Sequence, residues 1–388
     1  MTHEQETNVL SEAVQLVLEE GLEGLGPAVS VLLNEAMKIE RSRALAAEPW
    51  QRSPERKGYA NGYKPRGLKT RLGNLTLQVP QVRGDVDYYP SALDRGQRSE
   101  RALKLALAEM YVQGVSTRNV TEVLETMCGT TVSSSEVSRA SALLDGELEK
   151  WRCRPLGEVP YMVLDARYEK VRRDGAVASA AVLIASGVDA EGQRTILGVS
   201  VSMSEAEVHW REFLRSLKAR GLHGLKMVTS DDHDGLKAGL RGAFSGVPWQ
   251  RCQVHLQRNA AGYVPKADMR GQVAQTIREI FTAPDREEAQ RLLDKAVDKY
   301  QKSASKLAAW MSENLPEGFT AFSLPVKLRR RLRSTNMVEW VNKEIRRRTR
   351  VAGLFPNEQS LLRLVSALLV EISEDWETGK RYVSLNEE

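Results

Sequence analysis

Three acidic residues that lie far apart in the sequence stand in settings that could support chemistry. Asp165 and Asp231 directly follow short apolar runs at 161–164 and 225–230, which predicts a carboxylate at the carboxyl end of each of two buried strands. Glu339 lies in a basic segment that is predicted to be a helix packed on the same sheet. Three converging carboxylates suit a pair of Mg²⁺ ions, because Mg²⁺ takes oxygen ligands and can activate one oxygen while it stabilises a leaving one.

The helix of Glu339 is predicted to begin at Ser334 or Thr335, which are natural N-caps, since no Gly or Pro follows before Gly353. Several polar residues share its face or lie beside it: Asn336, Lys343, Arg346, Arg347 and Arg350. In one interpretation the carboxylate binds metal next to a polyphosphate backbone that the basic side chains hold. In the other, the helix is merely solvated and Glu339 pairs with Lys343 at i,i+4.

Two further carboxylates compete with Asp231 for the second position. Asp232 and Asp234 follow within three residues, but Asp231 alone directly follows the apolar strand. We therefore expect Asp231 to face the site and Asp232 to cap the following helix.

A cysteine and a histidine, Cys252 and His255, are spaced as half of a zinc site would be. No second pair lies nearby in the sequence to complete four ligands, and His209, His223 and His233 are scattered. A structural role, or a position next to phosphate, is therefore favoured over zinc.

Composition limits the kind of protein. The chain has 388 residues, 41% of them hydrophobic, and can bury a core spread over about two to four folding units. Its formal net charge is +5, and the clustering of Lys and Arg predicts a polyanionic partner. Three scattered cysteines argue against a disulfide framework. An acidic N-terminus and the lack of a membrane-length apolar run predict a cytoplasmic protein with no membrane partner.

The N-terminal part combines helices with a basic segment. Residues 8–47 show helical periodicity broken at 21–27, and their apolar stripe could serve either a partner helix or intramolecular packing. In 52–71 aromatic residues are interleaved with basic ones, as in a DNA-binding arm, although a flexible linker is the alternative. The candidate DNA contacts of this arm are Arg56, Lys57, Tyr59, Tyr63, Lys64 and Arg66. Residues 72–82 alternate as a short strand or hairpin does.

Residues 99–150 predict three consecutive helices. Ser133 and Glu136 form a capping box at the start of the third, and the short turn before it suits a helix-turn-helix. Such a motif would present Ser134, Ser135, Ser138 and Arg139 to DNA. The alternative is a three-helix unit that binds no DNA.

The order of elements after residue 160 indicates a mixed sheet. Three strands in a meander are followed by helix, strand, helix and strand, which is the order of a ribonuclease-H-like fold. Residues 256–320 are helical throughout and separate this sheet from the Glu339 helix, as an insertion would. Trp310 within the insertion could stack on a displaced base, or simply belong to its core.

In combination, these motifs resemble the Mutator-type transposases of bacterial insertion sequences, enzymes of the DDE class. The resemblance spans almost the whole chain and rests on residues 59–63, 79–84, 164–168, 229–237, 250–259 and 334–339. It implies a ribonuclease-H-like core interrupted by a helical insertion, with Asp165, Asp231 and Glu339 as the catalytic, metal-binding triad. The family's Cys-x-x-His pattern falls on Cys252 and His255, and we place Arg258 and Asn336 with them as supporting residues.

The resemblance also implies partners and a reaction. Family members bind the inverted repeats at their element's ends, typically act as homodimers, and are associated with copying through a joined or circular intermediate. We therefore expect a DNA transposase that uses two Mg²⁺ ions, with Mn²⁺ able to substitute, and takes no small-molecule substrate. It would work in the bacterial cytoplasm at the nucleoid. The rival hypotheses are a metal-dependent nuclease on the same core and an inactive, transposase-derived repressor.

The expected domain organisation follows from these segments. Mostly helical DNA-binding domains would precede an α/β catalytic core. The expected boundaries are a helical N-terminal region for dimerisation or DNA binding at 1–50, the basic arm with short strands at 51–95, the helix-turn-helix-like domain at 96–155, the first part of the core at 156–256, the helical insertion at 257–325 and the second part of the core at 326–388.

Overall fold

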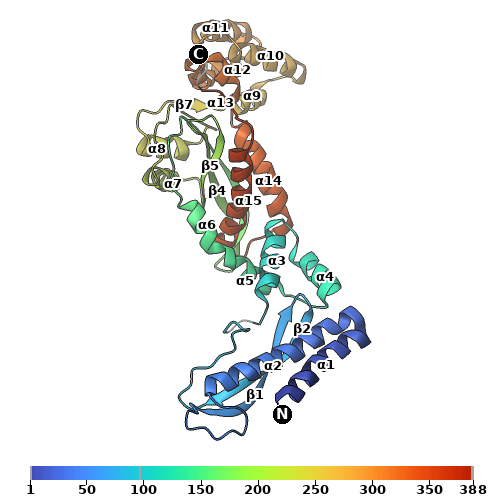
Figure 1. Ribbon diagram of the computed structural model, residues 1–388. Helices are drawn as coiled ribbons and strands as arrows, with labels where there is room; N and C mark the ends of the chain where they lie inside the picture. Colours follow the sequence, from blue (N-terminus) through green and yellow to red (C-terminus); the bar gives the residue numbers. More distant parts are fainter. Residues whose placement is uncertain (1, 96–97, 386–388) are drawn as a thin grey trace. The chain divides into compact units, whose positions relative to one another are not determined.

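The structure is a computed structural model that describes residues 2–95 and 98–385. The chain divides into two compact units, Met1–Leu143 and Leu144–Glu388 (Figure 1). No helix within the described ranges is both long and apolar enough to cross a membrane.

The first unit begins with a pair of helices and a hairpin. α1 (Thr2–Glu20) and α2 (Leu25–Leu45) are joined by the 3₁₀ turn η1 (Gly21–Gly24), where the sequence predicts a break. β1 (Tyr59–Thr70) pairs antiparallel with β2 (Gly73–Arg83), so most of the basic arm is a strand rather than a flexible linker.

The predicted apolar stripe is largely buried on α2 but largely exposed on α1. Met37 of α2 packs with Leu75 and Leu77 of the hairpin, whereas Leu10 and Leu18 of α1 are exposed. Intramolecular packing therefore accounts for only part of the stripe.

Three further helices complete the first unit. α3 (Arg101–Val112), α4 (Thr117–Cys128) and α5 (Ser134–Ser141) enclose a small core around Leu103, Leu107 and Val137. The predicted capping box is present, since Ser133 and Glu136 satisfy each other's backbone N–H groups. The short 3₁₀ turn η2 (Ala142–Leu144) follows, and α6 (Asp145–Arg152) begins the helices of the second unit.

The second unit is built on a five-stranded sheet of order β5-β4-β3-β6-β7. β3 (Tyr161–Arg173), β4 (Ala176–Val188) and β5 (Arg194–Ser202) form an antiparallel meander. β6 (Met227–Ser230) and β7 (Trp249–Arg251) then add to it in parallel. The predicted order of strands and helices along the chain, from the meander to the last strand, is therefore confirmed.

One strand boundary differs from the prediction. Asp165 does not end its strand but is the fifth residue of β3, which continues to Arg173. The apolar run ends there because β3 pairs with β6 only over Tyr161–Val163, and beyond that point it pairs with β4 as a partly exposed ribbon. Asp165 thus lies just past the point where the two parallel strands separate.

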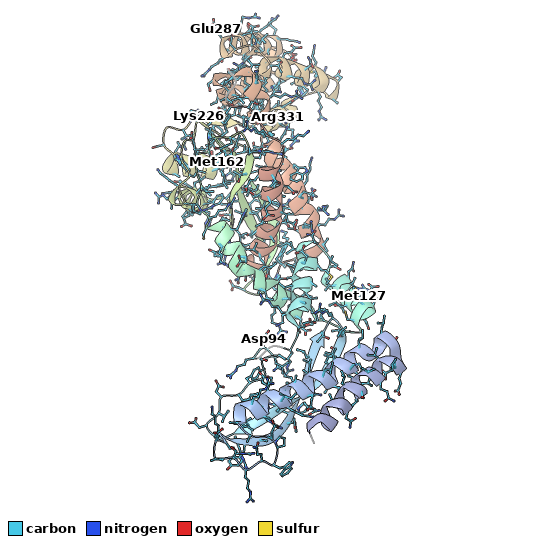
Figure 2. All side chains as sticks on the ribbon, viewed as in Figure 1. Asp94, Met127, Met162, Lys226, Glu287 and Arg331 are labelled. Atoms are coloured by element: carbon cyan, nitrogen blue, oxygen red, sulfur yellow. The ribbon has the colours of Figure 1, made fainter. Side chains whose placement is uncertain are left out.

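Helices cover both faces of the sheet (Figure 1). α7 (Glu207–Ala219) and α8 (Asp234–Ala243) pack Trp210, Leu214 and Leu236 against one face. α14 (Asn336–Ala352) and α15 (Glu358–Thr378) lie side by side on the other and contact β3 and β5. Met162 lies in the sheet layer, nearly free of solvent exposure (Figure 2).

Between β7 and α14 the chain forms a helical subdomain with its own core. Its α-helices are α9 (Gln253–Ala260), α10 (Arg270–Phe281), α11 (Arg286–Gln301) and α12 (Ser305–Asn314), whereas the next helix, α13 (Val326–Leu332), packs its Leu328 and Leu332 against the sheet. The 3₁₀ turns η3 (Ala261–Tyr263), η4 (Ala267–Met269), η5 (Leu315–Gly318) and η6 (Thr320–Ser323) connect them. Trp310 is 8% exposed and stacks on Tyr263, so it belongs to the core of this subdomain.

Side chains bind backbone groups of β5, one of the two edge strands of the five-stranded sheet. The Ile196 N–H of edge strand β5 donates to Ser373 Oγ, 3.2 Å away. Arg154 donates to the Ile196 carbonyl at 2.5 Å, and Arg220 donates to the Leu197 carbonyl at 2.9 Å. A register shift between β4 and β5 falls at this point.

Candidate active site

Asp165 is held by groups on both sides of its carboxylate. Oδ1 accepts a hydrogen bond from the Ala166 N–H at 2.9 Å, and Oδ2 accepts one from Asn342 Nδ2 at 2.7 Å. Burial raises the pKa of Asp165 to about 6, and the negative charges of Asp231 and Glu205 act in the same direction. The carboxylates of Asp231 and Glu205 are thus near enough to act on the charge of Asp165.

Asp231 follows β6 directly, at the edge where β3 and β6 separate. Its Oδ1 accepts the N–H of Asp232 at 2.8 Å and lies 3.8 Å from His255 Nδ1. The side chain is 44% exposed, so it remains accessible to a ligand.

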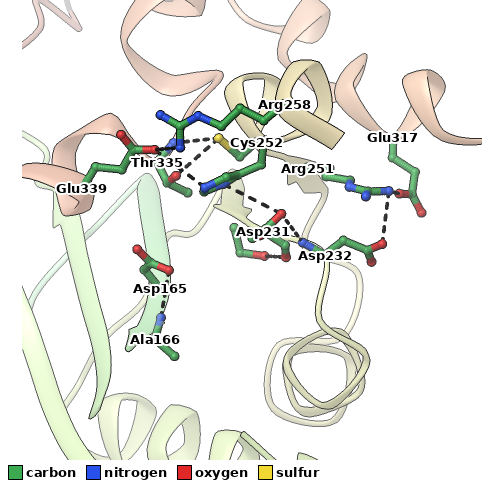
Figure 3. A network of polar contacts seen from close by, with 12 residues as sticks. Asp165, Ala166, Asp231, Asp232, Arg251, Cys252, Arg258, Glu317, Thr335 and Glu339 are labelled. Carbon is green, nitrogen blue, oxygen red and sulfur yellow. Dashed lines mark hydrogen bonds and ion pairs between the residues drawn. The ribbon is translucent and has the colours of Figure 1, made fainter. Parts of the chain in front are cut away.

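Asp232 turns away from this space into a separate ion cluster (Figure 3). Its carboxylate contacts Lys237 and lies 3.1 Å from Arg251 Nη1. Arg251 is only 4% exposed and also binds Glu317 at 2.8 Å. The expected helix cap is therefore wrong, since α8 begins at Asp234 with His233 as its N-cap and Asp232 is occupied by two cations.

Glu339 lies in the first turn of α14. Its Oε1 is 3.2 Å from Arg258 Nη1 and 3.7 Å from His255 Nε2, and the side chain is 21% exposed. Glu339 thus pairs with two residues of α9, and no ion pair with Lys343 is formed within the described chain. Figure 3 shows Asp165, Asp231 and Glu339 around one space, although they come from three different elements.

His255 lies between two of the three carboxylates, with one ring nitrogen toward Asp231 and the other toward Glu339. A hydrogen bond with Cys252 is the main cause that raises the pKa of His255 to about 9, while burial opposes it. Burial pushes the pKa of Cys252 upward, but hydrogen bonds from His255 and Thr335 outweigh it, and the net shift is downward. The raised pKa of His255 therefore favours an imidazolium between the two carboxylates.

The segment before α14 is fixed to the sheet by several polar contacts. Thr335 donates its N–H and its hydroxyl to Cys252 Sγ, each at 3.3 Å. Gln253 N–H donates to the Arg333 carbonyl at 3.1 Å, and Thr229 Oγ1 donates to the Leu332 carbonyl at 2.8 Å. Thr335 is at the N-cap position, as predicted, but its hydroxyl contacts sulfur instead of capping the helix. These contacts place Glu339 one turn further on.

α14 is also docked along β3. Besides the bond from Asn342 to Asp165, Arg167 of β3 donates to the Asn342 carbonyl, and Thr349 Oγ1 donates to Glu169 at 2.9 Å. Neither Asn342 nor the contact of Thr335 with sulfur was predicted from the sequence. A signal existed for Asn342, because it lies three residues after Glu339 and hence on the same helix face.

The fourth predicted supporting residue lies outside this arrangement. Asn336 is exposed at the first position of α14, and within the described chain it joins none of these contacts. Cys252, His255 and Arg258 are the supporting residues that the structure brings to the carboxylates.

The carboxylates of Asp165, Asp231 and Glu339 offer oxygen ligands for a hard cation, but they do not lie close enough together to form a complete metal site. No three His, Cys, Asp or Glu side chains among residues 2–95 and 98–385 are grouped closely enough to hold a metal. The donor chemistry nevertheless fits Mg²⁺ or Mn²⁺, which prefer carboxylate oxygens. Burial is the main cause of the raised pKa of Asp165, the negative charges of Asp231 and Glu205 add to it, and a bound cation would favour the ionised carboxylate.

The predicted DNA-contact residues differ in how free their side chains are. Those that are exposed are Lys57, Tyr59, Tyr63, Lys64, Ser134, Ser135, Arg139, Lys343, Arg346, Arg347 and Arg350, whereas Ser138 is half-buried. Arg56 donates to the carbonyls of Glu48 and Gln51, and Arg66 donates to the Asp94 carbonyl. Arg56 and Arg66 therefore also hold the local fold of the first unit.

Comparison with known proteins gives a consistent result over nearly the whole chain. Residues 1–379 match the family model described as Transposase, Mutator family. The chain is 54% identical to the transposase for insertion sequence element IS406 of Burkholderia multivorans, over 98% of each chain. It is 42% identical to the transposase of ISRM5 from Rhizobium meliloti, over 98% of this chain and 96% of the relative. It is 34% identical to the transposase of IS256 in Tn4001 from Staphylococcus aureus, over 97% of each.

Proposed function

Since the chain belongs to the Mutator family of transposases, we propose that Asp165, Asp231 and Glu339 form the site at which this insertion-sequence transposase cuts and joins DNA. The cleaved strand would be at an end of the element, and its 3′-hydroxyl would be joined to DNA. One observation carries the assignment. His255 lies 3.8 Å from Asp231 and 3.7 Å from Glu339, while Asp165 is bound to the helix of Glu339 through Asn342.

The three carboxylates would hold two Mg²⁺ ions, for which Mn²⁺ can substitute. Such ions, when bound, activate an attacking oxygen and stabilise a leaving one in displacement at phosphorus. The family implies use of a divalent metal, and the partly exposed Asp231 leaves the site open to solvent.

Basic groups of the chain would hold and orient the DNA. His255, whose pKa is raised to about 9, places positive charge between Asp231 and Glu339 and reduces their mutual repulsion. Arg258 is 60% exposed beside Glu339 and can reach a phosphate next to the site. Lys343, Arg346 and Arg350 are exposed further along α14, where they would make salt-sensitive backbone contacts.

The sheet supports a ribonuclease-H-like catalytic core. Its first three strands are antiparallel, and the fourth is parallel to the first and pairs with it. We propose that 156–256 and 326–388 form this core and that 257–325 is an insertion within it. The separate hydrophobic core of that helical subdomain supports the division.

The remaining segments would recognise the element and bring its ends together. We propose that the hairpin region 51–95 and the helices in 96–155 bind the terminal inverted repeats, and that 1–50 contributes to a homodimer. The exposed Leu10 and Leu18 of α1 support a role in dimerisation. The product would form by copying through a joined or circular intermediate, at the nucleoid in the bacterial cytoplasm.

The test is cleavage and joining of a labelled duplex that carries the element's own terminal repeat, with Mg²⁺ and a plasmid target. We expect wild type to give both products and Glu339→Gln to give neither while still binding the duplex, since this change keeps size and removes charge. Cleavage without joining would indicate a nuclease. Metal-independent binding with no product from wild type would indicate a repressor.

A further inference from the structure

The carboxylate of Asp165 is bound by a side chain from the helix that carries Glu339. Asn342 Nδ2 donates to Asp165 Oδ2 at 2.7 Å, although the two residues lie 177 positions apart in the chain. The main chain of Asn342 is held from the same strand, because Arg167 donates to its carbonyl. Strand and helix are thus joined twice at this one residue.

The orientation of the Asn342 amide is fixed by its partner. A carboxylate accepts hydrogen bonds, so the NH₂ group faces Asp165 and the amide oxygen must face away. That oxygen, Oδ1, is buried and has no hydrogen-bond partner within the described chain. Leaving a buried carbonyl unpaired is unfavourable, and here its orientation follows from the bond that the NH₂ group makes to Asp165.

Asn342 also lies on the same helix face as Glu339. Residues three apart are neighbours on an α-helix, so a shift of Asn342 relative to β3 would carry Glu339 with it. The bond occupies Oδ2 of Asp165 and leaves Oδ1 with only the N–H of Ala166. Oδ2 is therefore the oxygen that ties Asp165 to the helix of Glu339, while Oδ1 accepts a bond only from its own strand.

We propose that Asn342 is a positioning residue that sets the orientation of Asp165 and its placement relative to Glu339. This inference rests on the proposed function of those two carboxylates. Groups that orient metal-binding side chains typically contribute about 10–100-fold in metal affinity or activity. Asn342 would act through Asp165 and would not touch the DNA.

The experiment compares Asn342→Ala and the isosteric Asn342→Asp with wild type in the full-length protein. Mn²⁺ binding is measured by calorimetry, and duplex affinity is measured by fluorescence anisotropy. The rate of cleavage of the end duplex is measured in single-turnover reactions. We expect about 10–100-fold weaker Mn²⁺ binding and slower cleavage for Asn342→Ala, with duplex affinity unchanged. Asn342→Asp should be worse, because it sets two carboxylates against each other. Urea unfolding of each variant verifies that it is folded.

Thr349→Val is the matched control. Thr349 makes a similar bond from α14 to β3, to Glu169 at 2.9 Å, but away from the three carboxylates. If Asn342 only attached the helix to the sheet, Thr349→Val would weaken Mn²⁺ binding as much, and the inference would be wrong. Wild-type Mn²⁺ affinity in Asn342→Ala would also overturn it. If Asp165→Asn and Glu339→Gln stay active as well, the proposed function itself fails, not only this inference.

Discussion

Cys252 Sγ accepts two hydrogen bonds from Thr335, one from its N–H and one from its hydroxyl, each at 3.3 Å. Both residues are completely buried, so neither donor of Thr335 can turn to water instead. The sulfur thereby fixes the last residue before α14. A residue that in sequence suggests half of a zinc site acts here as an acceptor that places a helix.

Cys252→Ala should destabilise the protein. It leaves two buried donors of Thr335 unpaired, which costs about 1–3 kcal/mol for each group. We expect a lower free energy of unfolding in urea and slower cleavage, with Cys252→Ser intermediate because its hydroxyl can still accept. Cys153→Ala is the control, since Cys153 is exposed. Equal stability of Cys252→Ala and Cys153→Ala would contradict this role.

Asp231 and Asp232 should respond differently to removal of charge. Asp231→Asn should reduce cleavage at least about a hundredfold, the scale seen when one electrostatic group of a reaction centre is lost. Asp232→Asn should keep cleavage within a few-fold but lower stability by about 1–3 kcal/mol, because it weakens the buried cluster of Arg251. Rate and urea unfolding are measured for both. The reverse pattern of rates would assign the second position to Asp232.

Glu136 makes the first unit sensitive to acid. A hydrogen bond from Lys69 is the first cause that lowers its pKa to about 2, and the capping contact with Ser133 adds to it. Because the folded pKa lies below the ordinary 4.5, the stabilisation is complete above about pH 4.5 and is lost as pH falls toward 2. The gap in unfolding free energy between wild type and Glu136→Gln should therefore narrow from pH 6 to pH 3.5. A constant gap would show that the charge contributes nothing.

The basic side chains of α14 should contribute to DNA affinity without sequence preference. Arg346→Ala is expected to weaken binding of any duplex and to lower the slope of log K against log salt by about 0.9. Arg291→Ala removes one charge from α11, where Arg291 pairs with Glu288, and serves as the control. Titrations at several salt concentrations compare the two variants. An unchanged slope for Arg346→Ala would mean that Arg346 makes no phosphate contact.

Local sequence patterns predicted the order of strands and helices along the chain, because burial leaves an apolar run at each strand. They could not predict where β3 ends, because an apolar run indicates which residues other elements bury and does not indicate how far the backbone pairs with a neighbouring strand. Asp165, Asp231 and Glu339 could be selected because each has a recognisable local setting. The contacts of Thr335 with Cys252 and of Asn342 with Asp165 could not be predicted, because these partners lie 83 and 177 residues apart and only the folded packing brings them together. For Asn342, its position on the helix face of Glu339 was the one signal in the sequence.

The side chains along β5 have a consequence for how copies of the protein can assemble. An edge strand with free N–H and carbonyl groups can pair with a strand of another molecule, and long edges of this kind promote aggregation. At Ile196 and Leu197 these groups are already bonded to Ser373, Arg154 and Arg220. A strand from a second copy would have to displace two guanidinium groups to pair there. Continuation of the five-stranded sheet into another molecule is therefore blocked at this part of β5.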